Sequence, residues 1–376
     1  MKRAYRYRFY PSPVQEDLLN RTFGCVRYVY NRALTERSRA WTQEQKRVTF
    51  AETCRMLTSW KNDPDTAWLY EVSNVALQQG LQHLQNAYVN FWAKRAKYPT
   101  FKSKRKSRAS ATFTTSGFRY RDGQIWLAKT AGPLAIAWSR PLPEAAEPST
   151  VTVSRDAAGR WHISILMECP VETLPTAESA VGVDAGITSL VALSTGEKVT
   201  NPRHERRDRD RLALAQRRMA KRQNGSANRA KARAKVARVY ARIADRRRDV
   251  LHKLSTRLIR ENQTVIIEDL SVRNMVRNRK LARAISDASW SELRAMLEYK
   301  ADWYGRAVIA VDRFYPSSKT CSACGVLAAK MPLNIREWTC TECSVRHDRD
   351  VNAARVILAE GLSVAACGDG VRPSRA

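Results

Sequence analysis

Two short apolar runs decide how the second half of this 376-residue chain folds: residues 181–184, Val-Gly-Val-Asp, and residues 265–268, Val-Ile-Ile-Glu. Short runs rich in β-branched residues are typical of strands that are buried on both faces. Each run ends in a carboxylate, Asp184 or Glu268. Burying a carboxylate is costly unless it binds a metal or another partner, so both positions indicate a functional site.

A third carboxylate, Asp350, lies in the run His-Asp-Arg-Asp-Val-Asn-Ala-Ala at 347–354. Taken singly, each acid is equally well explained as a satisfied group at the end of an element. Taken together, Asp184, Glu268 and Asp350 match the needs of phosphodiester cleavage, where hard oxygen ligands hold two Mg²⁺ ions about 4 Å apart. We therefore predict an RNase H-like active site of the RuvC kind. Asp269 and Asp348 lie one and two residues from predicted ligands and stay open as replacements.

Four of the eight cysteines form two Cys-x₂-Cys pairs separated by fifteen residues: Cys321, Cys324, Cys340 and Cys343. Four thiolates at this spacing predict one structural Zn²⁺ in a zinc ribbon, with no open position for catalysis. The residue after the second pair is Ser344, where such a knuckle usually has a glycine because the position often needs φ > 0. The remaining cysteines are scattered singly, and we assign no role to them: Cys25, Cys54, Cys169 and Cys367.

The formal net charge of +30 implies a polyanionic partner. The excess is concentrated in residues 201–260, which hold 21 Lys or Arg against 5 Asp or Glu. Asn224-Gly225-Ser226 interrupts this stretch and predicts a basic helical hairpin that contacts nucleic acid rather than a merely solvated face. Residues 246–248, three consecutive arginines, are candidate phosphate contacts. No run approaches a membrane span or a signal peptide, so we expect a soluble protein of the prokaryotic cytoplasm or nucleoid.

The N-terminal half begins with period-2 alternation over residues 4–10, which predicts a strand. A helical pattern follows from Ser12 or Pro13 to about Lys97, with a break at residues 62–65, and then a basic loop at 98–106 and several short strands to about Glu168. Residues 170–180 carry two prolines and few large apolar residues, which places the main domain boundary there.

These motifs resemble the TnpB (OrfB) family of transposon-encoded nucleases, relatives of type V CRISPR effectors. The matching runs are GVDAGITSLVAL, VIIEDLSVRNM, SSKTCSACG, CTEC and DRDVNAARVIL in the C-terminal half, with YRFYPSP, VYNRAL and YPTFKSKRKS as looser matches before them. The resemblance implies an enzyme programmed by an RNA from the transposon end, which cuts double-stranded DNA beside a short transposon-adjacent motif. It also implies that Asp184, Glu268 and Asp350 bind the catalytic Mg²⁺ ions.

The resemblance further implies a multi-domain α+β architecture. A β-barrel "wedge" is expected over 1–13 and 96–175, interrupted by a helical recognition lobe over 14–95. A RuvC-like α/β domain is expected over 176–316 and 347–362, with the basic hairpin at 203–260 and the zinc ribbon inserted at 317–346. Residues 363–376 are expected to form a disordered tail.

Two alternatives remain open on the sequence. A catalytically silent, RNA-guided DNA-binding regulator would share every feature except cutting, but relatives of that kind have lost the acids that this chain retains. A DNA-joining transposase would use the same two-metal chemistry and would yield strand transfer rather than simple breaks.

Overall fold

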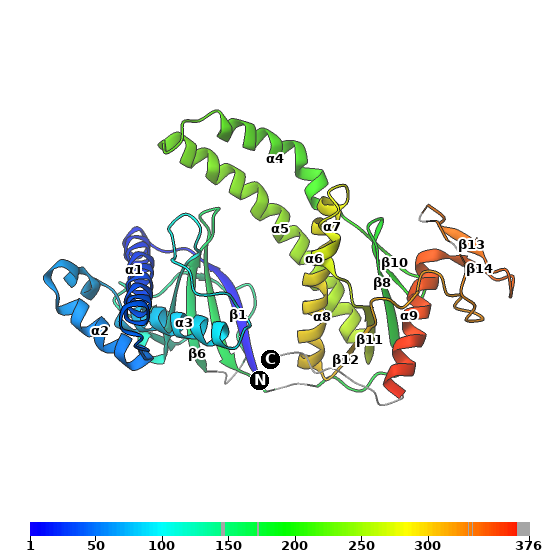
Figure 1. Cartoon of the computed structure of the whole chain (residues 1–376), viewed down its shortest axis with the longest axis horizontal. Coiled ribbons are helices and arrows are strands. Elements are labelled where there is room, and N and C mark those ends of the chain that lie inside the picture. The colour runs from blue at the N-terminus through cyan, green and yellow to red at the C-terminus, as the bar shows by residue number, and fades with distance from the viewer. Residues whose placement is uncertain (144–146, 171–172, 330, 333, 367–376) are drawn as a thin grey trace. The chain divides into compact units, whose positions relative to one another are not determined.

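The computed structural model describes residues 1–143, 147–170, 173–329, 331–332 and 334–366. The chain forms two compact units, Met1–Pro170 and Val171–Ala376, with mixed helices and sheets in each (Figure 1). The division falls at the first proline of the segment 170–180.

The N-terminal unit is built on a five-stranded sheet whose neighbouring strands are all antiparallel, in the order β2-β6-β7-β1-β5. Its strands are β1 (Lys2–Phe9), β2 (Ala109–Thr114), β5 (Ile136–Ala137), β6 (Pro148–Arg155) and β7 (Trp161–Glu168). A separate hairpin pairs β3 (Phe118–Arg121) with β4 (Gln124–Leu127). The strand predicted over 4–10 is confirmed, since Tyr7 and Phe9 alternate inward along β1.

Helices fill the long connection between β1 and β2. They are α1 (Pro13–Glu44), α2 (Phe50–Asn62), the 3₁₀ helix η1 (Pro64–Glu71) and α3 (Asn74–Trp92), with a short 3₁₀ turn η2 (Thr115–Gly117) after β2. The predicted start of the first helix is confirmed, because Ser12 and Gln15 form a reciprocal capping box and Pro13 occupies the first turn. The predicted break at 62–65 is also confirmed, since α2 ends at Asn62 and η1 begins at Pro64.

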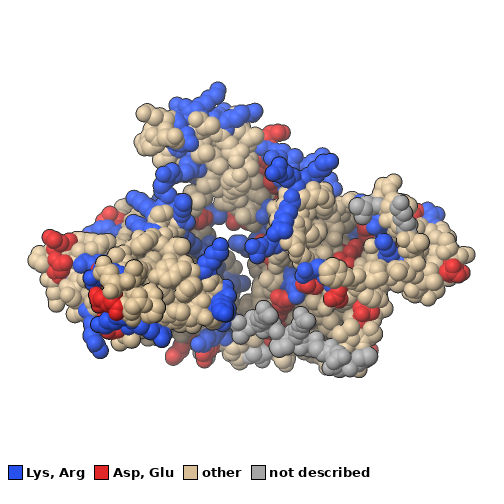
Figure 2. All heavy atoms as spheres, in the orientation of Figure 1, with Lys and Arg blue, Asp and Glu red and all other residues tan. Residues whose placement is uncertain are grey.

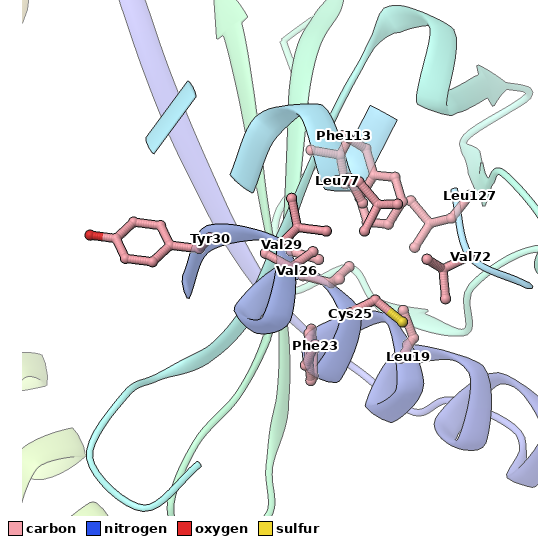
Figure 3. Packing of buried hydrophobic residues seen from close by; sticks show 14 of the residues in the cluster. Leu19, Phe23, Cys25, Val26, Val29, Tyr30, Val72, Leu77, Phe113 and Leu127 are labelled. Carbon is pink, nitrogen blue, oxygen red and sulfur yellow. The ribbon is translucent and has the colours of Figure 1, made fainter. Parts of the chain in front are cut away.

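The core of the N-terminal unit lies between these helices and the sheet. In Figure 3, Val26 and Val29 of α1 lie near Leu77 of α3 and Phe113 of β2, and Phe23 of α1 belongs to the same cluster. These apolar side chains are almost completely buried. The strands and helices of this unit therefore share one hydrophobic core.

The C-terminal unit contains a mixed five-stranded sheet in the order β10-β9-β8-β11-β12. The strands are β8 (Ala180–Ala185), β9 (Ser189–Leu193), β10 (Lys198–Thr200), β11 (Thr264–Glu268) and β12 (Ala307–Val311). β8, β11 and β12 are parallel to one another, whereas β9 and β10 are added antiparallel. The two apolar runs that end in carboxylates are thus adjacent parallel strands.

Helices cover both faces of this sheet (Figure 1). The helices of this unit are α4 (His204–Ala220), α5 (Ala227–Glu261), α6 (Val272–Met275), α7 (Ala282–Ala288), α8 (Trp290–Tyr304) and α9 (Arg349–Ala366). Of these, α4 packs on α5 and projects away from the sheet. Apolar residues of α5 and α8 pack with Val183 and Ile267 on one face, and Ile357 of α9 packs with Ile266 on the other. The helical hairpin predicted within 201–260 is confirmed as α4 and α5, which are separated at Asn224-Gly225-Ser226.

The C-terminal end of the chain differs in part from the sequence expectation. The expectation of a disordered tail from residue 363 is wrong for 363–366, because α9 continues to Ala366 through Ser-Val-Ala-Ala, in which alanine is the strongest helix former. Residues 367–376, including Cys367, lie outside the described residues. A small hairpin of β13 (Glu337–Thr339) and β14 (Arg346–Asp348) precedes α9 and carries part of the cysteine cluster.

Candidate active site and metal centre

The alternation of side chains along two parallel strands places Asp184 and Glu268 on the same face of the sheet. Residues 182 and 266 pair across β8 and β11, as do 183 and 267, so the next residues on each strand are Asp184 and Glu268. The odd-numbered neighbours, Val183 and Ile267, face α5 and α8. Because strand side chains alternate with a period of two, both carboxylates face α9 instead.

Helix α9 brings the third acid, because Asp350 lies in its first turn. The approach of α9 to the sheet depends on two glycines. A Cβ on Gly182 would lie 2.0 Å from the carbonyl oxygen of Ala354, and one on Gly361 would lie 2.3 Å from Cγ2 of Ile266. Only glycine allows a helix backbone this close to a strand. The two glycines therefore set the position of α9 and, with it, of Asp350.

The three acids interact electrostatically. Partial burial, followed by the charges of Glu268 and Asp350, raises the pKa of Asp184 to about 8. Three carboxylates near one another resist common ionisation unless a cation binds between them. Hard carboxylate oxygens are the ligands that Mg²⁺ prefers, so the residues fit a divalent cation of this type.

Several side chains that the sequence did not predict hold these acids. The hydroxyl of Ser317 donates to Oε1 of Glu268 over 2.6 Å. Nζ of Lys198 lies 3.6 Å from Asp350, and a guanidinium nitrogen of Arg336 lies 3.5 Å from it. Lys198 is on β10 and Ser317 follows β12, so only the folded topology brings them to the acids.

The neighbouring acids that stayed open on the sequence have other contacts. Asp269 is held by Arg294 at 2.5 Å and Arg313 at 2.6 Å. Although burial opposes it, hydrogen bonds from these two guanidinium groups lower the pKa of Asp269. Asp348 accepts from Nζ of Lys198 over 2.6 Å and from the backbone N–H of Val351 at the start of α9. These contacts favour Glu268 and Asp350 over their neighbours as metal ligands.

The four predicted cysteines converge in the C-terminal unit. The Sγ atoms of Cys321, Cys324, Cys340 and Cys343 all lie within 4.8 Å of one another. The two Cys-x₂-Cys turns repeat the same backbone hydrogen bonds, in which the N–H of the first cysteine donates to the carbonyl five residues later. Backbone N–H groups of Cys343 and Glu342 lower the pKa of the Cys340 thiol to about 7, which favours a thiolate. The cluster fits the soft ligand set of Zn²⁺.

The positions after the two turns have the predicted left-handed backbone. Gly325 has φ of 79° and Ser344 has φ of 56°. His347, which the sequence analysis did not single out, lies beside the cluster with Nε2 at 3.1 Å from Sγ of Cys321. Its ring is buried and contacts Trp338.

The arginines at 246–248, predicted as phosphate contacts, each pair with an acid of another helix. Arg246 pairs with Asp208 at 3.0 Å, Arg247 with Asp287 at 2.8 Å, and Arg248 with Glu292 at 3.0 Å. These acids come from α4, α7 and α8, so the three pairs hold the base of the hairpin. The sequence could not reveal this, because the partners lie at least 38 residues away.

A different set of residues on α5 is available to bind phosphate. Lys231, Lys235, Arg238 and Arg242 follow one another at steps of four, three and four, which places them on one helix face. All four are exposed, and within the part of the chain that the structure describes they form no ion pair. Figure 2 shows Lys and Arg side chains over the visible surface of the α4–α5 hairpin. We call these four residues the α5 stripe.

Among the described residues, no helix is long and apolar enough to cross a membrane.

Three family models match the chain. The model OrfB_IS605, "Probable transposase", matches residues 162–279, and the "Cas12f1-like, TNB domain" matches residues 290–357. A "Helix-turn-helix domain" of the same OrfB family matches residues 1–46, which here form strand β1 and the single long helix α1.

Curated relatives match over the full length of the chain. It is 64% identical to a "Putative RNA-guided DNA endonuclease" of Streptomyces pristinaespiralis, across 100% of this chain and 93% of that protein. It is 33% identical to the Escherichia coli K12 protein of the same description called InsQ, across 100% and 96%. Among solved structures, the Cas12f1–sgRNA–target DNA complex matches with a TM-score of 0.57 at 16% identity, covering 91% of this chain and 82% of that chain. This last likeness concerns the fold.

Proposed function

Since the chain belongs to the TnpB (OrfB) family, we propose that it is a metal-dependent RNA-guided DNA endonuclease whose catalytic acids are Asp184, Glu268 and Asp350. The proposal is carried by the placement of Asp184 and Glu268 on one face of two adjacent parallel strands, with Asp350 near enough to help raise the pKa of Asp184. A catalytically silent regulator would not need to keep three mutually repelling acids together.

The topology of both units supports the finer fold assignment. Along the chain, the C-terminal sheet has three antiparallel strands, β8 to β10, followed by two parallel ones, β11 and β12. Numbered from 1 to 5 along the chain, these strands lie side by side in the order 3-2-1-4-5, which is the order of an RNase H-like domain. In the N-terminal unit, backbone hydrogen bonds from Tyr10 to Ala135 and from Leu134 to Ile125 link the open sheet to the β3–β4 hairpin. These bonds support the proposed wedge barrel.

Two Mg²⁺ ions bound by the three acids would supply an activated water and stabilise the leaving oxygen of the cut strand. The chain's own residues prepare that site. Ser317 fixes the orientation of Glu268 by donating to one of its oxygens, and Lys198 and Arg336 partly neutralise Asp350. The α5 stripe would bind phosphates of the guide RNA or of the target DNA, which base pairing selects.

We also propose that the four-cysteine cluster binds one structural Zn²⁺. The cluster immediately precedes α9, and Nδ2 of Asn352 in α9 donates to the carbonyl of Thr320, next to Cys321. A folded cluster would therefore help to fix the helix that carries Asp350. Elemental analysis of the purified protein is expected to give about one zinc per chain. A value near zero in well-folded protein would exclude the ribbon.

The function is tested by sequencing the RNA that co-purifies with the protein and then supplying a plasmid that matches its variable end. We expect Mg²⁺-dependent linearisation of the matched plasmid and no cutting of an unmatched one. Binding without cutting would identify a regulator, and joined DNA products would identify a transposase. Either result would replace the proposed function.

A further inference from the structure

A groove rich in aromatic and basic side chains lies in the N-terminal unit, at the end of α1 and α3. It has a volume of about 570 Å³. Its lining comes from four segments: the last turns of α1, residues 46–48 after that helix, the last turns of α3, and Tyr98 in the basic loop. None of the proposed catalytic acids lines this groove.

The groove exposes aromatic rings that a hydrophobic core would normally cover. Trp41 is 57% exposed, Trp92 43% and Tyr98 44%. The buried ring of Tyr88 holds two of them, because it stacks on Trp92 at 5.5 Å and meets Tyr98 edge to face at 5.6 Å. Large apolar surface that stays exposed in a fixed geometry is typical of a binding site.

Two arginines lie beside these rings. The guanidinium of Arg37 lies 4.1 Å from the centre of the Tyr88 ring, and that of Arg47 lies 4.5 Å from the centre of the Trp92 ring. Arg37 is only 6% exposed and donates to the neutral Gln85. In the described part of the chain, no carboxylate forms an ion pair with either arginine or with Lys46.

A buried guanidinium without a counter-charge is costly, and a second cation nearby increases that cost. Burial, together with the charge of Arg47, lowers the pKa of Arg37. An anionic ligand that entered the groove would offset both effects. The required ligand therefore combines a flat ring that stacks on indole with a negative charge that pairs with guanidinium.

The wall of the groove is held in place before any ligand binds. The hydroxyl of Tyr98 is within hydrogen-bond distance of Ser38 at 2.8 Å and of Tyr88 at 3.0 Å. Further along the same loop, Asn31 of α1 bonds both the N–H and the carbonyl of Lys102. Preorganised rings lose little entropy on binding, which favours affinity.

We propose that this groove binds an unpaired nucleotide of single-stranded nucleic acid, with its base stacked on Trp41 or Trp92 and its phosphate at Arg37 and Arg47. Every base has a face that can stack, so the site is tolerant of sequence. The unpaired nucleotide can belong to the RNA or to a displaced DNA strand. This inference goes beyond the proposed function, because it concerns binding by the N-terminal unit and requires no cleavage.

The experiment uses the full-length protein and two probes, a twelve-nucleotide oligouridine RNA and the matching oligothymidine DNA. Ultraviolet crosslinking followed by mass spectrometry reports where each probe lies, which matters because other basic surfaces also bind it. We expect crosslinks on the peptides that contain Trp41 or Trp92. The probe that crosslinks more strongly at equal concentration identifies the source as RNA or DNA.

Variants test the stacking contact. Because base stacking on an aromatic ring is lost, Trp41→Ala and Trp92→Ala should each weaken binding and reduce the groove crosslink about fivefold or more, whereas Trp41→Phe should retain most of both. Trp68→Ala is the matched control, since Trp68 is a 39% exposed tryptophan of the same unit that does not line the groove. Wild-type affinity and crosslinking in both groove variants would overturn the proposal. If these variants behave as expected while matched plasmid is never cut, only the proposed function fails.

Discussion

At the scale of single residues, the candidate site depends on which acids face the same space. Asp184 and Glu268 are placed by strand alternation, and their neighbour Asp269 points to Arg294 and Arg313 instead. Ionised Asp184 therefore opposes folding until a cation binds, whereas Asp269 contributes to folding through its ion pairs. This difference can be measured without any cleavage assay.

Replacement of Asp184 by Asn should stabilise the metal-free protein at neutral and higher pH. The folded-state pKa of Asp184 is raised to about 8, so its favourable protonated state is fully present below its ordinary pKa of about 4 and is lost as the pH rises through 8. Asp184→Asn should therefore gain about 1 kcal/mol at pH 8, or roughly 2–4 °C in Tm, and little at pH 5.

Thermal unfolding in chelator across pH 5–8.5 provides the measurement. Asp269→Asn is the control and should be destabilised at pH 7, because Arg313 loses its ion pair and Arg294 keeps only Glu298. Added Mg²⁺ should stabilise the wild type and not Asp184→Asn. Equal Tm values for wild type and Asp184→Asn at every pH would contradict the convergence of the acids.

Ser344→Gly should stabilise the cysteine cluster. Ser344 has φ of 56°, a left-handed conformation that glycine adopts without strain, as Gly325 does after the first turn. The gain should be up to about 1 kcal/mol. It is measured as slower zinc loss to a chelator, and Gly325→Ser should lose zinc faster. If Ser344→Gly loses zinc as fast as the wild type, backbone strain at this turn is negligible.

At the scale of elements, the packing of α9 on β8 sets the position of Asp350. Gly182→Ala would place a methyl group 2.0 Å from the backbone of α9, so the helix must move away. We expect a loss of about 3 kcal/mol in stability and a marked loss of cleavage.

Gly24→Ala is the matched control for Gly182→Ala. Gly24 lies within α1, and an added Cβ meets no atom within 4 Å. That substitution should be neutral or stabilising by about 0.5–1 kcal/mol, as expected for alanine in a helix. Guanidinium denaturation and plasmid cleavage of both variants check the prediction, and unchanged cleavage by Gly182→Ala would show that α9 does not need this close approach.

A second prediction at this scale concerns the α5 stripe. The double variant Lys235→Gln, Arg238→Gln removes two exposed cations that form no ion pair with any described acid, so it should weaken nucleic-acid binding and lower the salt slope by about two. The control double variant, Arg209→Gln with Lys253→Gln, removes cations already paired with Glu205 and Asp249. Titrations at several salt concentrations distinguish them, and equal slopes would mean that the stripe is only solvated.

At the scale of the whole molecule, local sequence patterns predicted much of the fold and of the candidate site. Short apolar runs predicted the strands that end at Asp184 and Glu268, and the paired cysteines predicted a cluster that the structure brings together. Patterns failed where the deciding partner is distant. The acids that pair with the arginines at 246–248 come from three other helices, and Lys198 and Ser317 come near the three candidate acids only through the order of the strands.

The aromatic and basic groove of the N-terminal unit could not be predicted from the sequence either. Trp41, Trp92 and Tyr98 are far apart in the sequence, and helical periodicity alone would assign such residues to a core. Their exposure becomes informative only when the fold shows them beside Arg37 and Arg47. Binding surfaces of this kind need the three-dimensional arrangement to be found.

We propose that many Lys and Arg contacts bind nucleic acid, whereas three acids hold the metal ions needed to cut it. Cleavage and binding measured on the same variants test this division most directly. Plasmid cleavage with Mg²⁺ and a matched guide, and gel-shift binding, are measured for Asp184→Ala, Glu268→Ala and Asp350→Ala, with Asp269→Ala and Asp348→Ala as controls. We expect each of the first three to lose cleavage on the order of a thousandfold while binding stays nearly intact, and the controls to retain more activity. Cleavage at the wild-type rate by both Asp184→Ala and Glu268→Ala would contradict the two-metal nuclease account.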